Sequence, residues 1–216
     1  MEASKETYRK KGDLTKSEES LLVEKLSSEL KFHEMEIKKI RDIFKKYVKG
    51  NWFMDLPLFS EFLHISFGLV DVFFMDRIFT AADVDKDKRI DLEEFIRIVL
   101  IMLRGTVDAK IKLCFTCYDL SENNELTRDD ITTLLLEALN EPPTKNNNAD
   151  ALRDLVEAVF SKMDLDGDGV ISYEEFTAAC YEDYLIMQSF GQILPDHRHR
   201  AAFLVLLDTE KAIEEM

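Results

Sequence analysis

A string of twelve residues in the last third of the chain places acidic side chains at fixed intervals. From Asp164 to Glu175 it reads Asp-Leu-Asp-Gly-Asp-Gly-Val-Ile-Ser-Tyr-Glu-Glu, with acids at positions 1, 3, 5 and 12 and glycine at position 6. This spacing lets one loop surround a hard cation with oxygen atoms, and the glycine allows the sharp turn. An acidic surface turn would not specify five positions at once, so the string predicts a calcium-binding loop. Its predicted ligands are Asp164, Asp166, Asp168, the Val170 carbonyl, Ser172 (directly or through water) and bidentate Glu175.

Two further strings repeat the pattern at residues 83–94 and 119–130. Each of the three strings begins four residues after a phenylalanine and carries an apolar residue at position 8, namely Ile90, Leu126 and Ile171. We expect that residue to face the core from a short β-bridge between paired loops. The flanking segments have helical periodicity, and a loop of this kind between two helices is the EF-hand. The sequence therefore predicts an all-α EF-hand protein.

The string at 83–94 keeps every ligand position but departs from the pattern at position 6. Lys88 stands where glycine is expected, and a residue with a Cβ adopts the left-handed conformation at a cost of roughly 1–2 kcal/mol. The nearby basic side chains also offset part of the acidic charge, so we expect a weaker site than at 164–175. Its predicted ligands are Asp83, Asp85, Asp87, the Arg89 carbonyl, Asp91 and Glu94.

The string at 119–130 has fewer carboxylates and ends on aspartate, which reaches less far than glutamate. Such a loop could stay empty, bind Ca²⁺ weakly, or accept Mg²⁺ with water completing the shell. Asn124 at position 6 tolerates a positive φ better than lysine does. The candidate ligands are Asp119, Ser121, Asn123, the Glu125 carbonyl and Asp130.

EF-hands pair, so three visible copies require a fourth, which we place between Phe44 and Phe62. The string from Gly50 to Pro57 there has almost no calcium ligands in register, so this first hand is interpreted as degenerate and retained for packing. A helix is expected to start near Thr15 or Ser17. The predicted organisation is an N-terminal extension and helix (1–33), an N-terminal lobe of two hands (34–104), a C-terminal lobe of two hands (105–180) and a C-terminal helical tail (181–216).

Composition bears on partners and compartment. The 216 residues carry a net charge of −15, which disfavours nucleic acid and anionic membranes and favours cations and basic partner segments. No apolar signal segment or membrane-spanning run is visible, and Glu2 replaces the glycine that myristoylation requires. We therefore expect a cytoplasmic protein without a membrane anchor. Its three cysteines fit a reducing compartment.

Catalytic signatures are missing from the sequence. No G-x-S-x-G, Walker A, H-E-x-x-H or glycine-rich dinucleotide pattern occurs, so an enzyme is not expected. Cys114 and Cys117 form a C-x-x-C pair without a second ligand pair, and we interpret them as buried thiols. The tail holds two predicted helices, at 181–190 and 198–215. Its apolar segment, 201–208, is either an ordinary core helix or a lid or partner contact, and both alternatives stay open here.

Segments between the loops resemble the calaxin family of EF-hand proteins over most of the chain, from about Ile40 to Asp196. The Leu103-Arg-Gly segment is shared with the wider neuronal calcium sensor superfamily, and its combination with the tail segments favours calaxin. The matching segments are 62–68, 75–79, 103–110, 114–115, 153–157, 162–164, Ser189-Phe-Gly191 and Leu194-Pro-Asp196.

The resemblance implies a degenerate first hand and metal sites at the other three. It also implies a calcium sensor of the cilium or flagellum axoneme that binds the outer-arm dynein heavy chain, its docking complex or microtubule-associated machinery and regulates ciliary beating. Lys88 and the poor third loop depart from the family pattern. The alternative is a constitutive axonemal docking adaptor with a structural ion, or a different EF-hand regulatory subunit.

Overall fold

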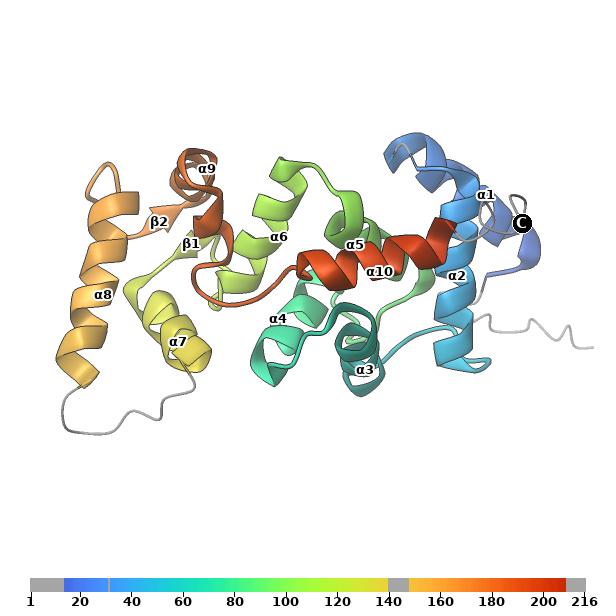
Figure 1. Ribbon diagram of the computed structural model, residues 1–216, viewed down its shortest axis with the longest axis horizontal. Coiled ribbons are helices and arrows are strands. Elements are labelled where there is room, and N and C mark those ends of the chain that lie inside the picture. Colours follow the sequence, from blue (N-terminus) through green and yellow to red (C-terminus); the bar gives the residue numbers. More distant parts are fainter. Residues whose placement is uncertain (1–13, 31, 140–147, 209–216) are drawn as a thin grey trace, which may run out of the picture.

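The computed structural model describes residues 14–30, 32–139 and 148–208 (Figure 1). The first part of the predicted N-terminal extension, residues 1–13, and the polar, proline-containing segment 141–147 lie outside these ranges. The fold is all-α apart from one two-stranded sheet. In order, the elements are α1 (Lys16–Leu30), α2 (Glu34–Val48), α3 (Leu56–Phe67), α4 (Val72–Ala82), α5 (Leu92–Arg104), α6 (Val107–Tyr118), β1 (Glu125–Leu126), α7 (Arg128–Leu139), α8 (Asn148–Met163), β2 (Ile171–Ser172), α9 (Tyr173–Glu182), the 3₁₀ helix η1 (Tyr184–Gln188) and α10 (His197–Asp208).

The predicted start of the first helix is confirmed. The backbone N–H of Glu18 donates to Thr15 Oγ1 at 3.3 Å, and the backbone N–H of Thr15 donates to Glu18 Oε2 at 2.8 Å. This reciprocal pair satisfies two donors that the first turn of a helix leaves free. α1 then packs on α2 and buries Leu22, Val23 and Leu26. The N-terminal helix is therefore part of the N-terminal lobe's core.

The first and second hands form the N-terminal lobe, from α2 to α5. Met54 and Ile90 exchange backbone hydrogen bonds of 2.9 and 2.8 Å across an antiparallel bridge, and both side chains are buried. The core between the helices is aromatic, with the Phe62 and Phe95 ring centroids 4.7 Å apart. The degenerate hand thus keeps the pairing of an EF-hand, as its interpretation as a packing unit requires.

The third and fourth hands form the C-terminal lobe, from α6 to α9. β1 pairs antiparallel with β2, which places Leu126 opposite Ile171. Both side chains are fully buried, so the apolar residues at position 8 of paired loops meet in the core as expected. The β1–β2 pairing and the contact between Leu126 and Ile171 fix the relative positions of the third and fourth loops.

α4 of the N-terminal lobe packs on α6 of the C-terminal lobe and joins the two. At this contact the Arg77 guanidinium donates to the Cys117 carbonyl at 3.0 Å and to the Asp119 carbonyl at 2.7 Å. These carbonyls end α6 and have no partner within the helix, so arginine satisfies them and complements the helix dipole. Figure 1 shows the lobes side by side along the long axis of the molecule.

The tail differs from the predicted pair of helices. Asp183 is extended (φ −140°) and ends α9, and its side chain accepts the backbone N–H of Leu185 at 3.0 Å, which starts η1. The expected helix at 181–190 is therefore an α-helical end followed by one short 3₁₀ helix. The second expected helix is α10, and residues 209–215 of that prediction lie outside the described part.

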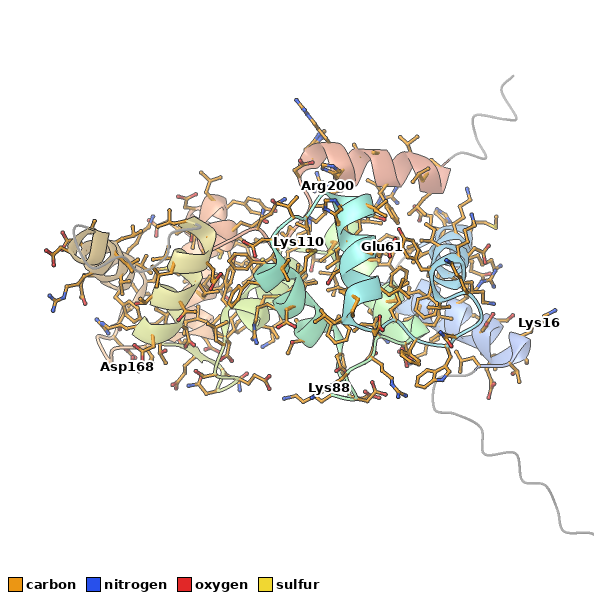
Figure 2. The ribbon with its side chains drawn as sticks, turned by 90° about the horizontal axis from the view of Figure 1, so that it is seen from below. Lys16, Glu61, Lys88, Lys110, Asp168 and Arg200 are labelled. Carbon is orange, nitrogen blue, oxygen red and sulfur yellow. The ribbon has the colours of Figure 1, made fainter. Side chains whose placement is uncertain are left out.

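α10 leaves the C-terminal lobe and lies across the N-terminal lobe, against α2, α3 and α5 (Figures 1 and 2). Phe203 is buried with its ring centroid 5.1 Å from that of Phe67, and Lys39 Nζ donates to the Leu207 carbonyl at 2.7 Å. The apolar segment 201–208 therefore packs against the N-terminal lobe, with Phe203 and Leu207 buried in its core.

Among the described residues no single helix is long and apolar enough to cross a membrane. α3 and α4 satisfy length and composition only together, and they are bent by 110°.

Candidate calcium sites

Loop 4, residues 164–175, gathers three carboxylates. Oxygen atoms of Asp164, Asp166 and Asp168 all lie within 4.8 Å of one another. The turn between them has positive φ at two glycines, +76° at Gly167 and +90° at Gly169, where a side chain would be strained. The donor set contains only oxygen, which suits Ca²⁺ or Mg²⁺ rather than a softer metal.

Glu175, at position 12 of loop 4, also caps α9. Its carboxylate accepts the backbone N–H of Ser172 at 2.9 Å and that of Leu165 at 2.7 Å, while Ser172 Oγ accepts the backbone N–H of Glu175 at 3.3 Å. Partial burial raises the pKa of Glu175, but these hydrogen bonds outweigh it and hold the pKa below its ordinary value. The residue that would close the shell around a cation is therefore also the residue that positions α9.

Loop 2, residues 83–94, forms a second cluster in which Asp83, Asp85 and Asp87 have oxygen atoms within 4.8 Å of one another. Lys88 has φ +62°, as its position in the loop predicted, and its backbone N–H donates to Asp83 Oδ2 at 2.8 Å. Burial raises the pKa of Glu94 to about 6. The loop thus has the backbone of a calcium loop, with a strained residue at position 6.

Loop 3, residues 119–130, is closed by its own side chains. Asp130 accepts Thr127 Oγ1 at 2.6 Å, the Thr127 backbone N–H at 2.9 Å and Ser121 Oγ at 3.2 Å. Asp119 accepts the backbone N–H groups of Asn123 and Asn124. Carboxylates stand at two of the predicted ligand positions here, against five in loop 2 and four in loop 4. The ligand assignments in all three loops stay predictions.

Two contacts around loop 2 were not visible in the sequence pattern. The first joins it to the degenerate hand, where the Arg89 guanidinium lies 4.5 Å from the Phe53 ring centroid and 5.3 Å from that of Trp52. Sequence patterns did not reveal this contact because Arg89 is far from Trp52 and Phe53 along the chain. The one signal was the presence of two adjacent aromatic residues in a loop that has few calcium ligands. Because the Arg89 carbonyl is the predicted ligand at position 7, the first hand packs on a residue that the second hand would use to hold the ion.

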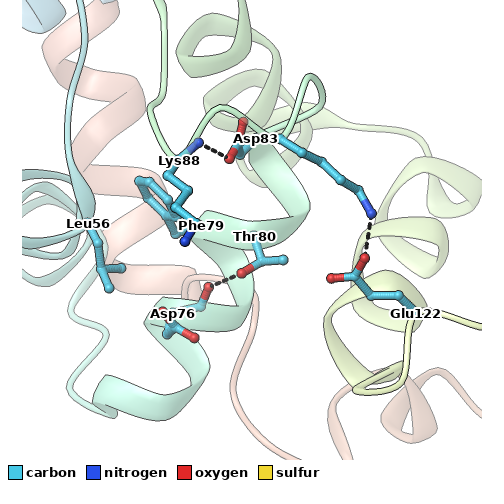
Figure 3. Close-up of a pocket in the computed structure, with 8 residues that line it drawn as sticks. Leu56, Asp76, Phe79, Thr80, Asp83, Lys88 and Glu122 are labelled. Carbon is cyan, nitrogen blue, oxygen red and sulfur yellow. Dashed lines mark hydrogen bonds and ion pairs between the residues drawn. The ribbon is translucent and has the colours of Figure 1, made fainter.

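The second contact joins loops 2 and 3 across the two lobes. Lys86 Nζ and Glu122 Oε2, both at position 4 of their loops, are 2.5 Å apart (Figure 3). They border a pocket of about 440 Å³ that Phe79, Asp83 and Lys88 also line. The pair is largely exposed, so its contribution to the free energy of unfolding is small. It is nevertheless a direct contact between loop 2 and loop 3.

Comparison with known proteins agrees with this geometry. A model of the EF-hand domain pair matches residues 108–181, and an EF-hand model matches residues 74–100. The chain is thus an all-α EF-hand protein, as predicted, and a calcium-binding protein by class.

Relatives define the family more narrowly. Calaxin of Danio rerio is 33% identical over 69% of this chain and 71% of the relative, and calaxin of Xenopus laevis is 35% identical over 69% and 72%. A recoverin family protein of Dictyostelium discoideum is 27% identical over 72% of this chain and 78% of its own. The chain belongs to the calaxin family.

Proposed function

We propose that this protein is a calcium sensor of the axoneme that regulates outer-arm dynein and hence the beating of cilia or flagella. Membership of the calaxin family supports the proposal, because the sequence features shared with that family imply this role. A regulator rather than an enzyme fits a protein in which, within the described residues, both clusters of three carboxylates lie in EF-hand loops. The proposed partners are the outer-arm dynein heavy chain or its docking complex.

The observation that carries a sensor role is the chain of contacts from loop 4 to the core of the N-terminal lobe. Glu175 lies in the first turn of α9, and α9 leads through η1 and the segment 189–196 into α10. Bound calcium would draw the carboxylates of loop 4 together, and Glu175 would then shift α9. Because the Phe203 ring on α10 packs against the Phe62 and Phe67 rings, such a shift would reach the N-terminal lobe.

Aromatic contacts hold this route together. The Tyr118 hydroxyl, beside loop 3, lies 3.1 Å from the Met187 carbonyl and 2.8 Å from the Gly191 carbonyl, both acceptors in the tail. Phe190 packs on the Tyr118 ring at 5.4 Å, and a Cβ at Gly191 would overlap the Phe74 ring of α4. The tail therefore passes between the lobes in contact with both.

The test disables the two best-formed loops in the intact protein. In axonemes that lack the endogenous protein, the double variant Glu94→Gln and Glu175→Gln is expected to bind but to lose the calcium-dependent change in beat waveform. Glu174→Gln, an exposed neighbour of Glu175, is the matched control and should restore the response. An unchanged calcium response in the double variant would contradict the proposal.

A constitutive docking adaptor is the second candidate, and the closed hydrogen-bond network of loop 3 favours it. An adaptor would bind its axonemal partner equally well with calcium or with a chelator, and the double variant would leave both binding and beat unchanged. Pull-down of dynein and of docking complex from axonemal extract, with and without calcium, separates the two candidates.

A further inference from the structure

A positive surface lies where the first turn of α10 meets α6, although the molecule as a whole carries a charge of −15. Arg198 and Arg200 come from α10, and Lys110 comes from α6. Figure 2 shows Lys110 and Arg200 at the same junction, and Figure 1 places that end of α10 beside α6. Arg198 is exposed, while Lys110 and Arg200 are half-buried.

None of these three cations forms an ion pair with any residue that the structure describes. The acids nearest to them in sequence are occupied. Asp108, beside Lys110, accepts the Tyr181 hydroxyl at 2.6 Å, and Asp196 accepts the backbone N–H of His199 at 2.8 Å and lies 3.0 Å from His199 Nδ1. Arg104 on the preceding helix, by contrast, is paired with Glu36 at 2.6 Å. The surface therefore offers unneutralised positive charge.

These charges weaken the fold rather than support it. Burial and the positive charge of Arg200 both lower the pKa of Lys110. Cations in the first turn of a helix also oppose the helix dipole, whereas Lys39 at the last turn of α10 complements it. A positive cluster that costs stability and has no internal partner indicates an external anion.

The outward side of α10 continues from the cluster. Arg198, Ala202 and Val205 follow one another at helical spacing, and Val205 is 62% exposed, while Phe203 on the opposite side is buried. The structure thus presents cations at one end of an uncovered helix face and small apolar side chains further along it.

We propose that Lys110, Arg198 and Arg200 form a docking surface for an acidic peptide segment of a protein partner. A short flexible segment can place its carboxylates on the three cations while the remaining acidic surface stays in water. A nucleic acid or a bilayer would instead face a larger area of a strongly negative molecule and be repelled. The surface is separate from the calcium loops, so the inference does not depend on the proposed function.

The experiment measures binding of fluorescein-labelled hexaglutamate to the full chain by anisotropy, in chelator and at low and high NaCl. The Lys110→Gln and Arg200→Gln double variant is expected to bind about tenfold more weakly, equivalent to about 1.4 kcal/mol. Lys46→Gln with Arg153→Gln is the control, because it removes the same charge from two exposed cations on other helices. The control should bind like the parent protein, and high salt should abolish binding.

Thermal unfolding separates docking from a structural role. Since the cations repel each other, the melting temperature of the Lys110 and Arg200 variant should stay the same or rise. A lower melting temperature, equal weakening in both double variants, or no hexaglutamate binding by the parent would overturn the proposal. Preferred binding to phosphatidylserine vesicles, or self-association by sedimentation that the variant abolishes, would assign the surface to a membrane or to a second copy instead.

Discussion

Lys88 shows how one residue can keep a calcium loop intact and still weaken it. Its φ of +62° is required by the turn at position 6, where loop 4 has a glycine and loop 3 an asparagine. A lysine there bears the steric cost of its Cβ against the backbone, roughly 1–2 kcal/mol. Lys86, at position 4 of the same loop, also has a positive φ of +58°, where loop 4 has Gly167.

Replacing Lys88 by glycine should relieve that strain. We expect Lys88→Gly to raise the free energy of unfolding of the calcium-free protein by about 1 kcal/mol, since part of the relief is offset by greater freedom in the unfolded chain. Urea unfolding in chelator measures it. Lys88→Gln, which keeps the Cβ, should raise calcium affinity by removing a charge but add no stability. Equal stability of the two variants would show that position 88 is not strained.

The reactivity of the three cysteines tests how firmly the core around them is closed. Cys114, Cys117 and Cys180 are buried, and burial raises the pKa of Cys117 and of Cys180 to about 12. Because only the thiolate reacts, and a raised pKa keeps the thiol protonated at neutral pH, a chromogenic disulfide reagent should modify the native protein very slowly. All three thiols should react quickly in urea. Rapid reaction in the native state would mean that this part of the core opens readily.

At the scale of the element, the first hand has lost its ligands but not its role as a neighbour. It contributes Met54 to the bridge with Ile90 and presents Trp52 and Phe53 to Arg89. Because of these contacts, a conformational change in the second hand can alter the first hand, although the first hand has lost its own calcium ligands. Trp52 is the chain's single tryptophan, which makes the response observable.

Calcium binding at loop 2 should therefore change tryptophan emission. The Arg89 carbonyl is the predicted ligand at position 7, so closing of the loop is expected to move the guanidinium across the indole. Fluorescence during a calcium titration should change in the parent protein and in Glu175→Gln, and should stay constant in Glu94→Gln. A signal lost in Glu175→Gln but kept in Glu94→Gln would show that Trp52 reports loop 4 instead.

Patterns within one element made the helices and loops predictable, whereas contacts between distant elements did not. The bridge at position 8 and the left-handed Lys88 followed from loop spacing, which is a local property. The end of α9 at Asp183 was missed, because the apolar residues that follow it continue a helical pattern. The sequence also did not predict which surface α10 packs against, because its apolar residues could be buried against any apolar surface.

For the whole molecule, α10 decides whether the two lobes act together. It begins beside the C-terminal lobe and ends on the N-terminal lobe, where Phe203 and Leu207 are buried. Gly68 and His199 meet so closely that a Cβ on the glycine would overlap the imidazole, which fixes the start of α10 at the turn after α3. Through Phe203, the tail that follows the C-terminal lobe is thus anchored in the N-terminal lobe.

Phe203→Ala should release α10 from the N-terminal lobe. A well-packed phenylalanine contributes about 3–5 kcal/mol, and a helix of 12 residues is marginal without tertiary contacts, so detachment should precede unfolding of either lobe. We expect stronger binding of an apolar dye and faster hydrogen exchange in α10 and α3, with little change in α8. Val205→Ala, on the exposed side of the same helix, should behave like the parent. If Phe203→Ala left dye binding unchanged and raised hydrogen exchange throughout both lobes, α10 would be an integral core helix. It would then not be a helix that can detach separately from the N-terminal lobe.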